Sequence, residues 1–238
     1  MDQETRSKDY YDEFSATYER HRGRGYHALV DELEVDLARR YCGGALLEAG
    51  CGTGLILERL ARCTGRAVGL DLSAGMLAHA RRRGLDVLQG TLESLPFAEG
   101  CFDAVVSFKV LAHVPGIALA LRELARVTRP GGHLVLEFYN KTSLRTLIKR
   151  LKQPTRIGGS FSDEDVYTRF DSLAEIRELL PETVELVAVR GVRVFTAVAQ
   201  LHELPIVGPL LGAAERWAAD APVLRRLGGF LIVVARKR

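Results

Sequence analysis

The sequence predicts an α/β fold in which a doubly wound, mostly parallel sheet carries helices on both faces. Short apolar runs alternate with helical patterns from residue 45 to residue 138. Strands that alternate with helices pair in parallel through right-handed crossovers, which place helices on both sides of the sheet. The chain has 238 residues, of which 47% are hydrophobic and 26% are charged, and this suits one globular unit with a full core.

Two helices are expected before the first strand. Tyr10, Phe14 and Tyr18 recur at four-residue spacing, which places them on one face of a helix. A second helix is predicted over 26–40, and the Gly43-Gly44 pair ends it. We therefore expect residues 1–42 to form an N-terminal helical cap.

Five strands and three helices are expected in the core, residues 43–139. The strands are predicted at 45–49, 67–70, 86–89, 102–107 and 133–138, and the helices at 55–62, 74–83 and 117–127. The segment 129–132 (Arg-Pro-Gly-Gly) predicts a turn before the fifth strand, because proline presets φ and glycine supplies positive φ.

Beyond the core the regular alternation is interrupted twice. We expect a basic insertion or lid at 140–170, then a C-terminal part at 171–238. That part is predicted to hold a helix at 173–180, a strand region at 183–198, an insertion at 200–225 and a last strand at 229–236. The two insertions and the N-terminal helices are expected at the mouth of the functional site. We expect them to surround a single core, so that residues 1–238 form one domain.

Charge and composition exclude several classes of protein. Against 30 Asp and Glu there are 33 Lys and Arg residues, and this balance is too weak for a general nucleic-acid binder. The longest strongly apolar run, 230–235, falls far short of the roughly 20 residues that cross a bilayer. The charged N-terminus lacks the apolar stretch of a signal peptide, and the four scattered cysteines form no zinc pattern. We expect a cytoplasmic protein without a metal.

The most informative segment is a glycine-rich turn between the first strand and the following helix. Gly50, Gly52 and Gly54 allow a tight turn and a close approach to a ligand. Asp71 ends the next strand, where a carboxylate suits the two hydroxyl groups of a ribose. Glu48 precedes the turn, and its charge would repel a pyrophosphate but attract an ammonium group. A ribose and a positive charge together favour S-adenosylmethionine.

Four ordered motifs resemble those of class I S-adenosylmethionine-dependent methyltransferases, of the type 11 group that includes ubiquinone-biosynthesis C-methyltransferases. They span residues 45–138 and comprise 47–54 (LEAGCGTG), 69–73 (GLDLS), 95–97 with 102–107 (LPF, FDAVVS), and 129–137 (RPGGHLVLE). The resemblance implies a Rossmann-like sheet of seven strands whose last strand, here 230–235, is antiparallel and inserted between its two predecessors. It also implies S-adenosylmethionine as cofactor and S-adenosylhomocysteine as product.

The resemblance assigns parts of the cofactor to particular residues. Gly50, Cys51 and Gly52 line the methionine part beside Glu48, and Asp71 binds the ribose hydroxyls. Adenine lies between Leu72 and Met76. Many relatives have an acid at the position of Thr91. In this chain the Thr91 hydroxyl would instead accept from the adenine amino group, and the amide of Leu92 would donate to a ring nitrogen.

The same resemblance assigns residues at the other end of the cofactor. Ser107 and Phe108 meet the methionine carboxyamino end. Tyr11 and Tyr18 either close over the cofactor, as tyrosines of this first helix often do in relatives, or pack against the core.

Methyl transfer from a sulfonium needs a base only when the acceptor must lose a proton. His113 follows the fourth strand at the edge where such sheets bind ligands, and we expect it either to act as the base or to pack beside the cofactor. Tyr139, at the end of the fifth strand, is expected to contact the acceptor, with Glu137 and Asn140 nearby. Lys109 either points across the same crevice or is a solvated surface lysine.

Residues 141–152 have the pattern of a basic amphipathic helix, which is either a lid or a contact for a membrane or an anionic, lipid-like acceptor. The prediction is therefore methyl transfer to a small molecule, with no nucleic-acid partner. The acceptor atom and the oligomeric state stay open. Two alternatives remain: an NAD(P)-dependent oxidoreductase on a similar core, and a non-catalytic S-adenosylmethionine-binding protein.

Overall fold

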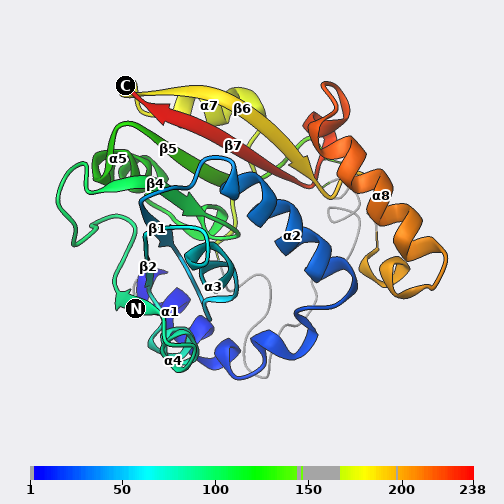
Figure 1. Cartoon of the computed structure of the whole chain (residues 1–238), viewed down its shortest axis with the longest axis horizontal. Helices are drawn as coiled ribbons and strands as arrows, with labels where there is room; N and C mark the ends of the chain where they lie inside the picture. The colour runs from blue at the N-terminus through cyan, green and yellow to red at the C-terminus, as the bar shows by residue number, and fades with distance from the viewer. Residues whose placement is uncertain (1–2, 144–145, 147–166, 197) are drawn as a thin grey trace.

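The sheet has seven strands, as the resemblance implies. The computed structural model describes residues 3–143, 146, 167–196 and 198–238. Figure 1 shows the sheet with its helices. Across the sheet the strands are β3 (Asp86–Gln89), β2 (Arg66–Asp71), β1 (Ala45–Ala49), β4 (Phe102–Ser107), β5 (Thr128–Tyr139), β7 (Phe230–Lys237) and β6 (Val184–Val192).

The first five strands are parallel, whereas β7 is antiparallel to both β5 and β6. This arrangement confirms the predicted Rossmann-like sheet. It also confirms the inserted antiparallel last strand.

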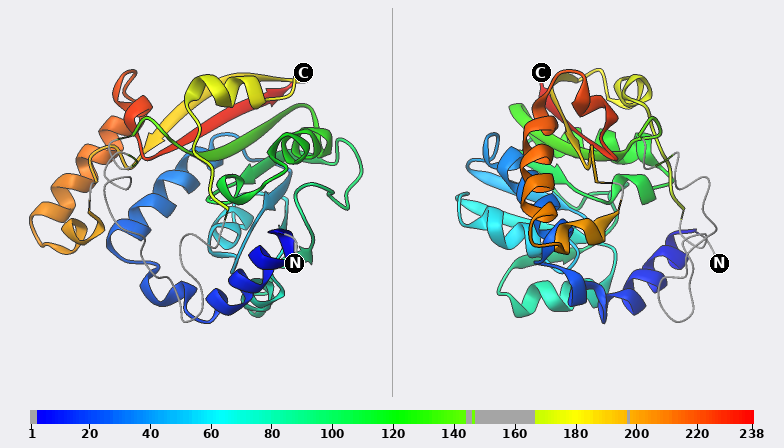
Figure 2. Two further views of the ribbon diagram at one scale, coloured as in Figure 1. Left: turned by 180° about the vertical axis from the view of Figure 1, so that it is seen from behind. Right: turned by 90° about the vertical axis from the view of Figure 1, so that its right-hand side faces the viewer.

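Helices cover both faces of the sheet (Figure 2). They are α1 (Gln3–Ser15), α2 (Gly25–Arg39), α3 (Leu55–Ala61), α4 (Ala74–Arg82), α5 (Ile117–Val127), α7 (Leu173–Leu179) and α8 (Val207–Asp220). Short 3-10 turns lie at η1 (Tyr18–His21), η2 (Leu111–His113), η3 (Ala199–Glu203) and η4 (Leu224–Leu227). One hydrophobic core joins the sheet to α2, α3 and α4, and a second joins its other face to α5 and α7.

Strand alternation places acidic side chains under α2. Leu46 of β1 and Val135 of β5 both belong to the core on the α2 side. Because side chains two positions apart in a strand share a face, Glu48 and Glu137 point to that side as well. Both are almost completely buried, with 2% and 1% of their surface exposed. The sequence therefore directs two carboxyl groups into the interior beside the functional end of the sheet.

Three local predictions were wrong. The turn expected at 129–132 lies within β5, which begins at Thr128 and forms a bulge between the pairs Phe102↔Thr128 and Ala104↔His133. Gly131, at φ 76°, supplies the positive φ that this bulge needs.

The strand expected at 183–198 ends at Val192. The backbone amides of residues 194–196 donate to the buried carboxylate of Glu215 in α8 at 2.7–3.0 Å, so they take no part in a strand ladder. Segment 200–225 is largely the helix α8, which packs beside α2 and β6.

Among the described residues, α8 contributes nothing to the wall of the pocket described below, so the expected position of 200–225 at the site's mouth is also wrong. Most of the basic segment 141–152 lies outside the described residues. Every helix within the described ranges is too short or too polar to cross a bilayer.

Candidate active site

The glycine-rich turn has the backbone that the sequence predicts. Gly50, Gly52 and Gly54 have φ of 81°, 53° and 83°. A Cβ at Gly50 would lie 2.2 Å from the side chain of Val110, so only glycine fits there. A Cβ at Gly52 would have no atom within 4 Å, so the missing side chain leaves open space beside the turn. This open space is where a ligand would approach the backbone.

Asp71 ties the end of β2 to the same turn. Its carboxylate accepts from the amide of Gly52 at 2.8 Å and from the amide of Ser73 at 2.9 Å. Burial raises the pKa of Asp71 above its ordinary value, and these two amide donors oppose the shift. Each oxygen has a further lone pair, so Asp71 is still able to accept from ribose hydroxyls.

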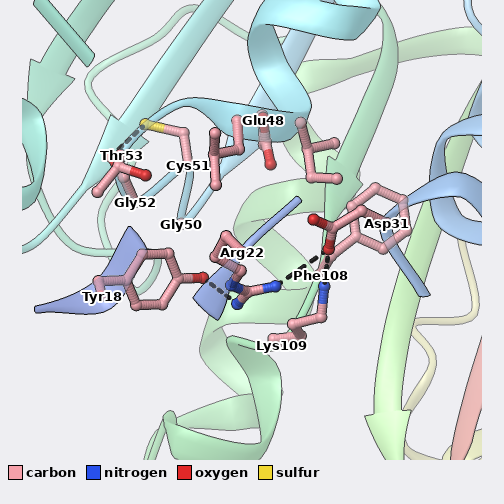
Figure 3. Close-up of a pocket in the computed structure, with 12 residues that line it drawn as sticks. Tyr18, Arg22, Asp31, Glu48, Gly50, Cys51, Gly52, Thr53, Phe108 and Lys109 are labelled. Atoms are coloured by element: carbon pink, nitrogen blue, oxygen red, sulfur yellow. Dashed lines mark hydrogen bonds and ion pairs between the residues drawn. The ribbon is translucent and has the colours of Figure 1, made fainter. Parts of the chain in front are cut away.

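Glu48 carries an unsatisfied oxygen at the wall of a pocket. The pocket lies between the glycine turn, the end of β4 and the N-terminal segment (Figure 3). Oε2 of Glu48 is buried and has no hydrogen-bond partner in the described structure. Burial, followed by repulsion from Glu34, raises the pKa of Glu48 well above its ordinary value. A cationic group beside Oε2 would supply the missing donor and favour the ionised form.

Two cations line the opposite wall of the pocket (Figure 3), and both are ion-paired. Arg22 donates to Asp31 at 3.0 Å and to the hydroxyl of Tyr18, and its guanidinium lies 4.6 Å from the centroid of the Tyr18 ring. Lys109 donates to Asp31 at 3.0 Å and to Glu34 at 2.7 Å. Burial alone lowers the pKa of Lys109, but attraction to Glu34 and Asp31 outweighs it and raises that pKa.

Two carboxyl groups, those of Glu34 and Glu137, lie together in the interior behind Lys109. Counted as carboxylates, both oxygens of Glu137 and Oε1 of Glu34 lack a donor in the described structure. A hydrogen bond between the two groups therefore requires a proton on one of them. Burial and then repulsion from Glu34 raise the pKa of Glu137 well above its usual value, and burial also raises the pKa of Glu34. Glu34 accepts from Lys109 through its other oxygen.

An N-terminal strap, residues 3–22, borders the pocket through Tyr18 and Arg22. Besides the Arg22–Asp31 pair, two further contacts hold it to the rest of the molecule. Asp12 accepts from the hydroxyl of Ser73 at 2.5 Å and from the amide of Gly75 at 2.8 Å, at the start of α4. Farther along, Glu19 pairs with Arg83 at 2.7 Å. In Figure 1 the strap runs along the edge of the molecule where α4 lies.

The structure gathers six of the predicted cofactor residues around one pocket: Tyr18, Glu48, Gly50, Cys51, Gly52 and Phe108. Ser107 is not at the pocket wall, because it is fully buried and its hydroxyl donates to the carbonyl of Ala49 at 2.8 Å. Lys109 is not a solvated surface residue but a half-buried partner in two ion pairs.

The residues expected around adenine lie beyond β2 and β3, beside Asp71 and outside the pocket wall. Met76 and Leu92 are buried, and Leu72 and Thr91 are half-buried. The Thr91 hydroxyl accepts from the amide of Glu93 at 3.3 Å.

His113 and Tyr139 meet at the ends of β4 and β5. Nε2 of His113 lies 3.4 Å from the hydroxyl of Tyr139, and the ring of Tyr11 lies 6.3 Å from that of His113. Burial raises the pKa of Tyr11 well above its ordinary value, and Tyr139, Tyr10 and Asp71 raise it further. The two predicted catalytic residues are therefore neighbours.

Sequence reasoning missed Arg22 and Asp31. Asp31 sits among apolar residues on the buried face of α2, where an acid is unusual, and Glu34 repeats this one turn later. That pattern is a usable signal for a buried ion pair. Arg22 gives no such signal, because only tertiary structure brings the strap to the pocket. The described residues hold no group of three His, Cys, Asp or Glu arranged for a metal.

Taken together, the sheet order, the glycine turn and the acid at the end of β2 define a Rossmann-like nucleoside-binding protein. The unsatisfied Glu48 further favours a cationic nucleoside over a pyrophosphate-containing one.

Comparisons with known proteins narrow this class. Residues 47–136 match the family described as methyltransferase domain. A probable S-adenosylmethionine-dependent methyltransferase of Mycolicibacterium smegmatis is 32% identical over 190 residues, which cover 78% of this chain and 69% of that protein. A malonyl-[acyl-carrier protein] O-methyltransferase of Erwinia pyrifoliae is 39% identical over 137 residues, which cover 52% of this chain and 51% of the relative.

The fold matches solved structures over nearly its whole length. A methyltransferase of Thermotoga maritima, described as a possible histamine N-methyltransferase, has a TM-score of 0.69 at 22% identity, covering 97% of this chain and 99% of that one. The chain belongs to the S-adenosylmethionine-dependent methyltransferases.

Proposed function

We propose that the chain binds S-adenosylmethionine between the glycine turn and the N-terminal strap and methylates a small-molecule acceptor at the end of β4 and β5. The observation that carries the proposal is the buried oxygen of Glu48, which lacks a donor beside the open space at Gly52. The α-ammonium of S-adenosylmethionine would supply that donor. The proposal keeps the predicted single domain, in which the cap 1–42 supplies Tyr18 and Arg22 to the pocket.

S-adenosylmethionine, when bound, supplies a methyl group activated by a sulfonium. The protein's task is to hold donor and acceptor in line and to keep water out, which accounts for several kcal/mol of such an acceleration. In this proposal Asp71 accepts from the ribose and Glu48 from the ammonium group. Tyr18 and Arg22 close the pocket from the strap, and His113 with Tyr139 faces the acceptor.

Calorimetry with S-adenosylmethionine and S-adenosylhomocysteine tests the cofactor site. We expect both to bind, and Asp71→Asn and Glu48→Gln each to weaken binding by about 1–3 kcal/mol, because a buried donor of the ligand loses a charged acceptor. Asp86→Asn is the control, since Asp86 lies at the other end of the sheet and makes only an exposed pair with Arg66. Binding of NAD without binding of either sulfur compound would contradict the proposal.

The named relatives use different acceptors. They include ubiquinone O-methyltransferases and demethylmenaquinone methyltransferases as well as the malonyl-[acyl-carrier protein] enzyme. The aligned part spans 51% of the malonyl-[acyl-carrier protein] enzyme, 50% of the ubiquinone biosynthesis enzyme and 64% of a demethylmenaquinone methyltransferase. Their acceptors are not transferred to this chain, and the acceptor must be inferred from the site itself.

A further inference from the structure

A continuous series of aromatic rings borders the His113–Tyr139 pair. The ring of Tyr139 lies 5.5 Å from His113, 5.8 Å from Phe170 and 5.0 Å from Phe230. Tyr11, 6.3 Å from His113, extends the series toward the strap. Tyr11, His113, Tyr139 and Phe170 are each only partly buried, so their rings still present surface. Rings gathered in this way favour a flat, unsaturated ligand, which makes edge-to-face and offset contacts with them.

Hydrogen bonds fix the tautomer of His113. Its Nδ1 lies 3.0 Å from the carbonyl oxygen of Tyr167, and a carbonyl only accepts. Nδ1 therefore carries the hydrogen, with the hydroxyl of Thr168 3.3 Å away. Nε2 is then the basic nitrogen, and it faces the ring series and the hydroxyl of Tyr139. The distance of 3.4 Å to that hydroxyl is long for an O–H···N bond, so a closer hydroxyl would compete well for Nε2.

The charges around the site disfavour other acceptor classes. A carboxylate acceptor needs a cation, but Arg22 and Lys109 are already paired with Asp31 and Glu34. A cationic amine needs a carboxylate, but Glu34 and Glu137 are fully buried behind Lys109, and Asp71 and Glu48 belong to the proposed cofactor site. A neutral hydroxyl requires neither.

We infer that the acceptor is a hydroxyl group on an aromatic ring and that Nε2 of His113 takes its proton. This inference rests on the proposed function and adds the substrate class. In the transfer step the hydroxyl proton passes to Nε2, and an oxygen lone pair forms the bond to the methyl carbon. The carbon–sulfur bond breaks at the same time, and its electron pair stays on sulfur, which becomes a thioether. His113 then releases the proton to solvent.

Matched probes separate the acceptor classes. The full chain with S-adenosylmethionine is offered catechol and 1,4-dihydroxynaphthalene, together with the cationic amine benzylamine, benzoate and 1,2-cyclohexanediol. Formation of S-adenosylhomocysteine measures turnover. We expect the aryl hydroxyl compounds to have the highest kcat/KM, at least tenfold above the amine, carboxylate and saturated analogues. The inference is overturned when another class is preferred, or when no aryl hydroxyl is turned over.

Variants of His113 and Tyr139 test the assigned base. His113→Asn keeps a side-chain donor for the Tyr167 carbonyl but removes the base, so we expect kcat/KM to fall about 100-fold or more. The acidic limb of its pH profile should also disappear. Among the described residues, the other titratable or charged groups near that position are Tyr11, Tyr139 and the Arg169–Asp171 ion pair. Tyr139→Phe keeps the ring contacts and should change KM more than kcat. His133→Asn is the control, because His133 lies in the middle of β5, where it pairs with Arg236 of β7.

Two further measurements show whether a negative result concerns the cofactor site, the acceptor or the assigned base. Calorimetry with S-adenosylhomocysteine reports on the cofactor site alone, so loss of turnover with normal cofactor binding bears on the acceptor and not on the proposed function. Nitrogen-15 NMR of His113 should show hydrogen on Nδ1 and a shift of Nε2 when catechol binds the S-adenosylhomocysteine complex. Hydrogen on Nε2, or a profile of His113→Asn identical to that of the parent, would overturn the assignment of the base.

Discussion

Glu137 is a buried acid whose pKa is raised well above its ordinary value, first by burial and then by Glu34. Its carboxyl group lies next to that of Glu34 beneath α2. Lys109 is ion-paired with Glu34 there, so a negative charge on Glu137 would be repelled by the charge on Glu34. A group whose pKa is raised in the folded state contributes stability that is present below its unfolded pKa and is lost as pH rises through the folded pKa. Glu137 therefore makes the protein less stable at alkaline pH.

Glu137→Gln should remove this pH dependence, because glutamine keeps an N–H donor for Glu34 and cannot ionise. We expect the free energy of unfolding to exceed that of the parent by about 1–3 kcal/mol at the alkaline end, with the difference shrinking toward pH 4. Urea unfolding followed by circular dichroism across pH 4–9 measures it. Acids whose pKa is lowered, such as Asp12 and Asp103, contribute stability that is lost as pH falls. Both proteins contain these acids, so their contribution cancels when the two free energies of unfolding are compared. A constant difference between the two proteins at every pH would contradict this account.

Residue-level predictions succeeded where local sequence determines the geometry. Gly50, Gly52 and Asp71 occupy a strand–turn–helix segment and the adjacent strand end, so their spacing alone places them together. Arg22 and Lys109 could not be predicted in the same way. Their roles depend on long-range pairing with Asp31, which brings the strap, α2 and the end of β4 to one point.

At the level of elements, the N-terminal strap controls access to the pocket. The pocket has about 40 Å³ of free space, whereas sites for drug-sized ligands usually span about 300–1,000 Å³. We therefore expect the strap to move when the methionine part of the cofactor enters this pocket. The contact between Glu19 and Arg83 is one of the contacts that hold it, and both side chains are partly exposed, at 32% and 26%.

Arg83→Gln should loosen the strap and speed the release of S-adenosylhomocysteine. Because a partly exposed ion pair contributes about 1 kcal/mol at most, we expect the dissociation rate to rise by up to about fivefold. Stopped-flow competition measures this rate. Arg62→Gln is the matched control, since Arg62 pairs with the same Glu58 that Arg83 contacts but does not reach the strap. Equal rates in both variants would show that this fastening does not control release.

The boundaries of helices and strands were predictable where the local sequence alone determines them. Strands β3 and β4 and helix α5 begin and end as expected, because each has a clear apolar period and turn residues at its ends. The expected helical face of Tyr10, Phe14 and Tyr18 is divided, since α1 ends at Ser15 and Tyr18 begins η1. The end of β6 was not predictable, because it depends on Glu215, which arrives from α8 to bind the amides beyond it.

For the whole molecule, the fold brings every proposed cofactor contact to one edge of the sheet. The carboxyl ends of β1, β2 and β4 supply the glycine turn, Asp71 and Phe108, and the strap closes the same edge. Ligands of open α/β sheets bind at this edge, where the strand order reverses on either side of β1. Cofactor binding should therefore join the strap to the sheet and stabilise the molecule as a unit.

This coupling predicts a large thermal shift. A ligand at 100 times its Kd stabilises the folded state by about 2.7 kcal/mol, and for a chain of this length that raises Tm by about 5–10 °C. Differential scanning fluorimetry with S-adenosylhomocysteine should show this shift, and NAD at the same concentration should not. Asp71→Asn should reduce the shift at fixed ligand concentration, whereas Asp86→Asn should keep it. A shift with NAD and none with S-adenosylhomocysteine would instead support the oxidoreductase alternative, because the ligand that stabilises the fold is the one that the strap and the glycine turn enclose.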